Sequence, residues 1–169
     1  MTAPGHQTTD WVFVVPGRLV GDVRAGLLIE LAHAARELQT QADAAARGDG
    51  WQREPLLRLD GSRALLCQLG WEREYPQEDV GVDMREHAWA LLTAIAAAHR
   101  RQREALARER PCGRGAGRRA LKRRVLALRE LLFSVEAWAA RATAATSWRA
   151  AAPAAPLQCG HRRRAGPPF

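Results

Sequence analysis

The chain has 169 residues, of which 47% are hydrophobic, and a formal net charge of +8. This length supports one domain with its own core and is short for two. The hydrophobic content excludes a wholly disordered chain. The charge is uneven, because residues 1–99 hold 9 Arg against 14 Asp or Glu, whereas residues 100–169 hold 17 Arg or Lys against 4 Glu. Such a split is typical of proteins that contact nucleic acid or anionic lipid, although GC-rich codon usage also raises the Arg content.

The amino-terminal residues 1–10 are polar, and we expect them to be disordered. They lack the basic and apolar regions of a signal peptide. The longest uncharged apolar run, residues 88–98, is far shorter than the roughly 20 residues that a membrane-spanning helix needs. The three cysteines show no metal-binding spacing and fit a reducing compartment. We therefore expect a cytoplasmic protein with no membrane contact.

Residues 11–15 (WVFVV) are β-branched or aromatic and precede Pro16, which predicts an extended strand. A lone strand leaves its backbone N–H and C=O groups unpaired, so a partner is required. The best candidate is the short extended run at residues 80–82. We predict a small two-stranded pairing that packs on helices.

Two helices are predicted between these extended segments. In residues 19–47 apolar side chains recur in steps of three and four, and the Gly-Asp-Gly at 48–50 ends the pattern. The second helix is expected to start near Pro55, to continue through the triplet at 60–62 and to stop at Gly70. The core candidates of the two helices are Leu19, Val23, Leu27, Leu31, Ala34, Leu38, Ala42 and Ala45, and then Leu56, Leu59, Leu66 and Leu69.

Residues 83–110 carry the strongest helical pattern, and we expect the other elements to pack around this helix. Asp83 and Glu86 have the spacing of a capping box at its start. Several arginines near its end suit the helix dipole. Its core candidates are Met84, Ala88, Leu91, Leu92, Ile95, Ala98 and Leu106.

A fourth helix is predicted from residue 117 to about residue 147, after a glycine-rich link. Its apolar row is Leu121, Val125, Leu128, Leu132, Val135, Ala139 and Ala142. Leu126 and Phe133 lie off this row. If they pack beneath the amino-terminal strand they belong to the core, which is the alternative that we favour. If they are exposed they form a candidate partner surface.

The four amphipathic helices predict a mainly α fold, a four-helix bundle-like domain over residues 11–148 with a minor two-stranded pairing. Residues 149–169 are rich in Ala, Pro and Arg and predict a disordered tail.

No catalytic residue, metal ligand or cofactor is assigned from the sequence. Glu30 and His33 have the Glu-x-x-His spacing of di-iron bundles, but the second such pair and the additional glutamates are missing. We interpret Glu30 as solvent-facing and His33 as a surface or hydrogen-bonded side chain. Asp83 and His87 are four residues apart, and we interpret them as a helix cap and a partly buried histidine.

A basic cluster occupies the start of the fourth helix, where positive charge opposes the helix dipole. Its members are Arg114, Arg118, Arg119, Lys122, Arg123 and Arg124. An anion should compensate them. The internal candidate is the acidic connector at residues 72–79, and the external candidate is a nucleic-acid phosphate backbone.

The order of Val14-Val15-Pro16, RALLCQLGW at 63–71, DVGVD at 79–83 and REHAWAL at 85–91 resembles small helical proteins of GC-rich bacteria that carry no assigned function. The resemblance covers residues 11–110, implies a helical fold and gives no active site to carry over. Because catalytic motifs are absent and the fourth helix has two apolar sides, we expect a non-enzymatic interaction or accessory protein that binds a partner protein or a second copy of itself. The alternative is a nucleic-acid-binding accessory protein that uses the basic carboxy-terminal part.

Overall fold

The computed structural model describes residues 11–48, 50–71, 78–109 and 115–151, with side chains as far as residue 142. The elements are β1 (Val12–Val15), α1 (Gly17–Ala45), α2 (Glu54–Leu69), β2 (Val80–Asp83), α3 (Ala88–Arg108) and α4 (Ala116–Ala151). The predicted mainly α fold with a two-stranded pairing is confirmed. Helix α4 passes the expected domain boundary at residue 148, while residues 1–10 and 152–169, both expected to be disordered, lie outside the described residues.

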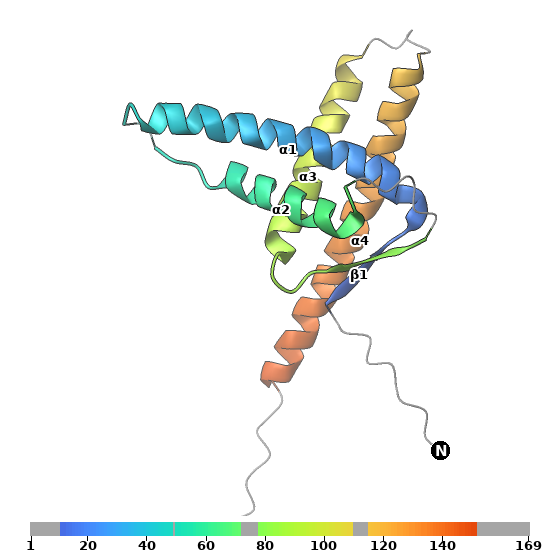
Figure 1. The fold of residues 1–169 in the computed structure, drawn as a ribbon. Coiled ribbons are helices and arrows are strands. Elements are labelled where there is room, and N and C mark those ends of the chain that lie inside the picture. Colours follow the sequence, from blue (N-terminus) through green and yellow to red (C-terminus); the bar gives the residue numbers. More distant parts are fainter. Residues whose placement is uncertain (1–10, 49, 72–77, 110–114, 152–169) are drawn as a thin grey trace, which may run out of the picture.

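The four helices form two antiparallel hairpins that lie across one another (Figure 1). Helices α1 and α2 make the first hairpin, and α3 and α4 make the second. The core fills the crossing, and its largest fully buried apolar side chains are Val15, Val20, Leu27, Leu65, Leu66, Leu69, Met84, Leu91, Ile95, Leu128 and Leu131. The end of α1 extends past this crossing, which explains why Ala42 and Ala45 are exposed although the sequence pattern predicts them in the core.

Strands β1 and β2 form the predicted two-stranded pairing. The structure shows that they run antiparallel, with Val12 opposite Asp83 and Val15 opposite Val80. Phe13 and Val15 point into the core and alternate with exposed residues, the period of a half-buried strand. On the other side of β2, the Gln68 side chain accepts a hydrogen bond from the Asp83 backbone N–H (2.6 Å) and donates one to the Asp83 carbonyl (3.1 Å). The Gln68 side chain of α2 therefore makes the two backbone hydrogen bonds that a third strand would make at this position.

Helix α1 begins directly after Pro16 and has no capping side chain of its own. Its first backbone N–H, from Gly17, donates instead to Asp79 Oδ1 at 2.9 Å. Because the first turn of a helix leaves N–H groups without partners, a carboxylate placed there satisfies one donor and complements the helix dipole. This contact ties the connector before β2 to the start of α1.

The capping box predicted at Asp83 and Glu86 is wrong. Helix α3 begins at Ala88, and Asp83 belongs to β2, where it pairs with Val12. Its carboxylate accepts a hydrogen bond from the Arg85 backbone N–H (3.0 Å), so it stabilises the turn before α3 rather than the helix itself. Because β2 is held extended by its pairing with β1, helix α3 cannot begin at Asp83.

Helix α2 continues through residues 60–62, as predicted, and Gly61 allows it to approach α3 closely. A Cβ atom on Gly61 would lie 1.9 Å from the Ala90 carbonyl oxygen. The face that carries Gly61 is therefore the buried one. Leu56, a predicted core residue, lies off this face and is exposed, whereas Leu65 is buried.

Candidate functional site

Helix α4 presents two large apolar side chains to solvent. Leu126 is 60% exposed and Phe133 is 75% exposed. They are seven residues apart, which places them on the same side of the helix about 10.5 Å apart along its axis. The opposite side of α4 supplies buried core residues, namely Leu121, Ala127, Leu128, Leu131 and Val135. We call the surface formed by Lys122, Leu126, Arg129 and Phe133 the outer face of α4.

The favoured expectation that Leu126 and Phe133 pack beneath the amino-terminal strand is wrong. The strand reaches α4 through Trp138, whose ring meets that of Trp11 edge-on at a centroid distance of 6.1 Å. Trp138 follows Phe133 by five residues, which turns it about 140° around the helix at 100° per residue. The strand therefore covers a different side of α4 and leaves the outer face open.

On the side toward α1, the charges beside the outer face are paired within the molecule. Arg18 of α1 donates to both carboxylate oxygens of Glu130 (2.5 and 3.1 Å). The Arg18 guanidinium lowers the pKa of Glu130, chiefly through this hydrogen bond. Arg123 Nε lies 3.6 Å from Asp22 Oδ2, also on α1. These two pairs hold α4 against α1 and have little charge to offer a ligand.

On the side toward α3, two basic residues of the outer face itself have no such partners. Among the described residues, Lys122 and Arg129 form no ion pair or hydrogen bond. His99 of α3 is half-buried in this positive region. Burial lowers the pKa of His99, and the charges of Arg103 and Arg129 lower it further. The seam between α3 and α4 is therefore electropositive.

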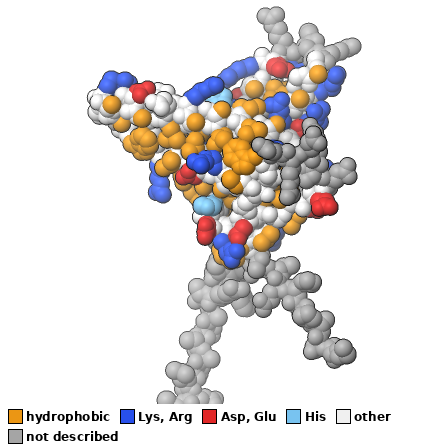
Figure 2. All heavy atoms as spheres, viewed as in Figure 1, with side chains coloured by type: hydrophobic (Ala, Val, Ile, Leu, Met, Phe, Trp, Pro, Cys, Tyr) orange, Lys and Arg blue, Asp and Glu red, His pale blue; other side chains and the backbone are white. Residues whose placement is uncertain are grey.

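The residues of the basic cluster predicted at the start of α4 do not form one surface, because some contact α3, one faces α1 and others are exposed. Arg118 Nη1 donates to the Glu109 carbonyl at 2.9 Å, and Arg124 Nη1 donates to Gln102 Oε1 at 3.3 Å, so both join α4 to α3. Arg123 faces Asp22, as described above, while Arg119 and Lys122 are exposed and Arg114 lies outside the described residues. Figure 2 shows Lys and Arg side chains around the end of the molecule where α3 finishes and α4 begins.

The acidic connector supplies none of the contacts found for this cluster. Asp79 caps α1, Glu78 is exposed, and residues 72–77 lie outside the described residues. The internal partners of these basic side chains come instead from α1 and α3, namely Asp22, Gln102 and the Glu109 carbonyl.

Glu30 is fully buried, which corrects its interpretation as solvent-facing. Its carboxylate accepts hydrogen bonds from Arg58 Nη1 (3.1 Å) and Arg101 Nε (2.7 Å). The same two guanidinium groups also contact Glu37, and the Arg58 hydrogen bond is the main cause that lowers the pKa of Glu37. This ion network joins α1, α2 and α3, and it accounts for Glu30 without a metal. His33 is half-buried and takes no part in it.

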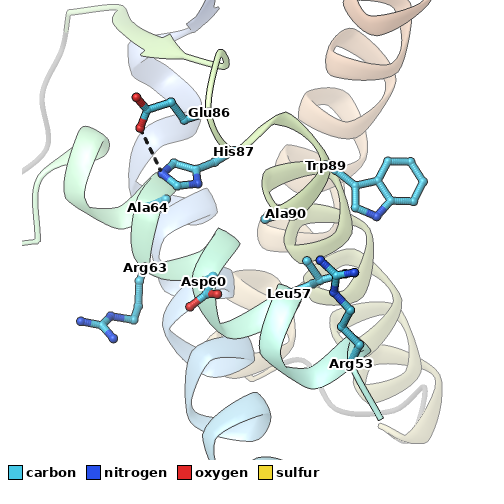
Figure 3. Close-up of a pocket in the computed structure, with 9 residues that line it drawn as sticks. All are labelled: Arg53, Leu57, Asp60, Arg63, Ala64, Glu86, His87, Trp89 and Ala90. Atoms are coloured by element: carbon cyan, nitrogen blue, oxygen red, sulfur yellow. Dashed lines mark ion pairs between the residues drawn. The ribbon is translucent and has the colours of Figure 1, made fainter.

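A hollow of about 400 Å³ lies between α2 and the turn before α3 (Figure 3). Its lining residues are Arg53, Leu57, Asp60, Arg63, Ala64, Glu86, His87, Trp89 and Ala90. His87 Nε2 lies 3.9 Å from Glu86 Oε2, and Figure 3 shows Arg63 and Trp89 pointing away from the hollow on opposite sides. Its two arginines and two carboxylates give the lining no dominant charge, and we assign it no ligand.

Within the described ranges, no three His, Cys, Asp or Glu side chains come close enough to hold a metal ion. Asp83 contacts Arg85, with Arg85 Nε 3.0 Å from Asp83 Oδ2, rather than His87. None of the described helices is both long and apolar enough to cross a membrane.

Neither a family model, nor a curated protein, nor a solved structure matches this chain. The resemblance to small helical proteins of GC-rich bacteria stays a prediction. We therefore infer function from the geometry of the described residues.

Proposed function

We propose that this chain is a non-enzymatic interaction protein that docks a partner protein on the outer face of α4. The observation that carries the proposal is the exposure of Phe133 and Leu126 on one side of a helix whose other side supplies the core. Single exposed apolar side chains are common on protein surfaces. Two large ones aligned on a helix and bordered by polar residues form the kind of surface that partner proteins bury.

The proposal is tested by photo-crosslinking at the outer face. A photoreactive phenylalanine analogue replaces Phe133 in the full chain, and a matched variant carries it at Leu28, an exposed apolar residue of α1. Both variants are irradiated in the source cells, and the crosslinked products are identified by mass spectrometry. We expect one defined protein to crosslink at position 133 and not at position 28. Equal labelling at the two positions, or none at position 133, contradicts the proposal.

A second candidate function is nucleic-acid binding by the tip of the α3–α4 hairpin. The observation that favours it is the exposed charge there, since Arg103, Arg108, Arg119 and Lys122 are all exposed and the first turn of α4 has no acidic residue. Phosphate contacts release counterions, so such binding is strongest at low salt. A gel-shift titration at about 50 mM salt decides this candidate. We expect a shift that is lost in the double variant Arg119→Ser, Lys122→Ser; the absence of any shift removes the candidate.

We also propose a cytoplasmic location, which the state of Cys67 supports. Cys67 is a free and exposed thiol, and its sulfur accepts a hydrogen bond from the Trp71 indole N–H at 3.3 Å. Exposed unpaired thiols persist in reducing compartments, whereas oxidising ones convert them to disulfides.

A further inference from the structure

The two flanks of the outer face of α4 differ in charge. Toward α1, Glu130 and Arg123 are paired with Arg18 and Asp22. Toward α3, Lys122 and Arg129 have no ion-pair partner among the described residues. The flank that faces α3 is therefore the one with positive charge available to a ligand.

We infer, on the basis of the proposed function, that the partner presents an acidic amphipathic helix to this face. In this arrangement apolar side chains of the partner cover Leu126 and Phe133, and its carboxylates pair with Lys122 and Arg129. Charge complementarity of this kind fixes the orientation of a partner and speeds its association.

The spacing along α4 fits a helical occupant better than an extended one. Leu126 and Phe133 are separated by two helical turns, about 10.5 Å. A helix that docks by one face presents its own apolar anchors at the same repeat, through positions i, i+3, i+4 and i+7. After Phe133 the same side of α4 continues with Ala137 and the exposed Ala140, whose small side chains allow another helix backbone to approach.

Three other occupants fit these residues less well. A second copy of the chain packed antiparallel on this face would set the basic flank against itself, and one packed parallel would set it against a flank whose Glu130 is already paired with Arg18. A membrane surface is bound by helices with a broad apolar face, whereas among the described side chains on this side of α4, as far as residue 142, only Leu126 and Phe133 are large and apolar. A nucleic acid would use the basic flank, but phosphate contacts would not account for the large exposed apolar side chains of Leu126 and Phe133.

The test uses the full chain and a set of synthetic 20-residue amphipathic helices as probes. Each probe carries Leu at helical spacing with Glu on both flanks, the members differ in the phase of the Leu row, and each has a counterpart with Lys in place of Glu. Binding is followed by fluorescence anisotropy of the labelled probe at about 50 mM and about 300 mM salt, because screening weakens exposed charge pairs. The variants are Phe133→Ser and the double variant Lys122→Glu, Arg129→Glu. The controls are Leu28→Ser and Arg63→Glu, which change exposed residues of α1 and α2. Circular dichroism and urea unfolding verify that each variant is folded.

We expect an acidic probe to bind and its lysine counterpart not to bind. Phe133→Ser should weaken binding about 30-fold, the size of a hot-spot residue. The double charge reversal should abolish binding of the acidic probe, and the two controls should leave it unchanged. Affinity should fall at the higher salt concentration.

The inference is overturned if no acidic probe binds, or if acidic and basic probes bind equally well. It is also overturned if light scattering shows a dimer that Phe133→Ser dissociates, or if only anionic lipid vesicles or a single-stranded oligonucleotide bind in a Phe133-dependent way. Photo-crosslinking at position 133 to a partner segment that is not an acidic helix would overturn the inference and leave the proposed function standing. The absence of any crosslinked protein would remove both.

Discussion

Glu30 of α1 and Arg101 of α3 form a 2.7 Å ion pair inside the crossing of the two hairpins, where the Glu30 side chain has no exposed surface. Arg58 of α2 contacts the other oxygen of the same carboxylate. One fully buried charge therefore joins three helices. Burying a charge is unfavourable unless it is paired and hydrogen-bonded, so these contacts restrict how the three helices can pack.

We predict that Glu30→Ala destabilises the fold by about 3–5 kcal/mol, because it removes the fully buried carboxylate that Arg58 and Arg101 share and leaves these guanidinium groups, among the described residues, with only the partly exposed Glu37 and Glu54. The matched control is Glu54→Ala, which removes an exposed carboxylate 3.8 Å from the same arginine. Exposed ion pairs contribute little, so this variant should lose about 1 kcal/mol or less. Urea unfolding of both variants gives the comparison. Equal losses would mean that the network does not stabilise the crossing.

Replacement of Gly61 by alanine should destabilise the fold by about 1–3 kcal/mol or more, since the added methyl group meets the backbone of α3 rather than a movable side chain. Gly117, near the start of α4, has open space at its Cβ position. Gly117→Ala should therefore be neutral or stabilising by up to about 1 kcal/mol, as helix propensity requires. Thermal unfolding of the two variants measures the contrast, and a stable Gly61→Ala variant would show that α2 and α3 do not approach this closely.

Removal of either outward apolar side chain of α4 should leave stability nearly unchanged. Phe133→Ser and Leu126→Ser are expected to shift the free energy of unfolding by about 0.5 kcal/mol or less, as for surface substitutions. Leu128→Ala, on the opposite side of the same helix, should cost about 2–5 kcal/mol because Leu128 is fully buried. If Phe133→Ser were as costly as Leu128→Ala, Phe133 would be a core residue and the docking face would not exist.

His99 should make stability depend on pH below neutrality. Its pKa is lowered in the folded protein, first by burial and then by Arg103 and Arg129, so the unfolded chain binds the proton more readily. Stability is therefore complete above the unfolded pKa of about 6.5 and decreases as pH falls toward the folded value. In the His99→Gln variant, the midpoint of urea unfolding should change less with pH over this range. Arg129→Gln should raise the His99 pKa, which an NMR titration measures; an unchanged value would place Arg129 away from His99.

Asp83 should contribute to stability down to low pH. The hydrogen bonds from the Arg85 side chain and backbone lower the pKa of Asp83 from 3.8 to about 2. A lowered pKa means that the stabilisation is present above the unfolded value of about 3.8 and is lost as pH falls through about 2. Asp83→Asn should remove this dependence between these two pH values. Acid titration followed by circular dichroism measures it, and identical acid transitions for the variant and the parent would contradict the contact.

The regular elements were predictable because their signals are local. The apolar rows that include Leu27, Leu91 and Leu128 have helical spacing and are buried, and the β-branched run before Pro16 pairs as expected. The start of α3 was not predictable in this way, since pairing of Asp83 with Val12 depends on residues 71 positions apart. Local capping signals carry no information about such a contact.

The positions of the three charged residues in the sequence carry a signal of the buried ion network. Glu30 follows Val23 by seven residues, Arg58 precedes Leu65 by seven and Arg101 follows Ala94 by seven, so all three lie on the sides of their helices that are buried. A charged residue in register with an apolar row indicates either exposure or a buried partner. Only the packing of the three helices shows which partners meet.

The outer face of α4 was predictable from the sequence only in part. Sequence spacing separates Leu126 and Phe133 from the main apolar row, but whether another element covers them depends on where β1 docks. The contact between β1 and Trp138 depends on tertiary packing, and this packing decides whether Leu126 and Phe133 lie in the core or on the surface.

The most direct test of an acidic partner helix on this face is the pKa of His99, measured by NMR in the full chain with and without a saturating acidic helical probe. His99 lies beside Arg129 on the seam that the partner's carboxylates would occupy. We expect the pKa to rise when the probe is bound, because nearby carboxylates stabilise the protonated imidazole. A pKa that stays the same while the probe is bound would place the probe elsewhere and contradict the proposed docking on α4.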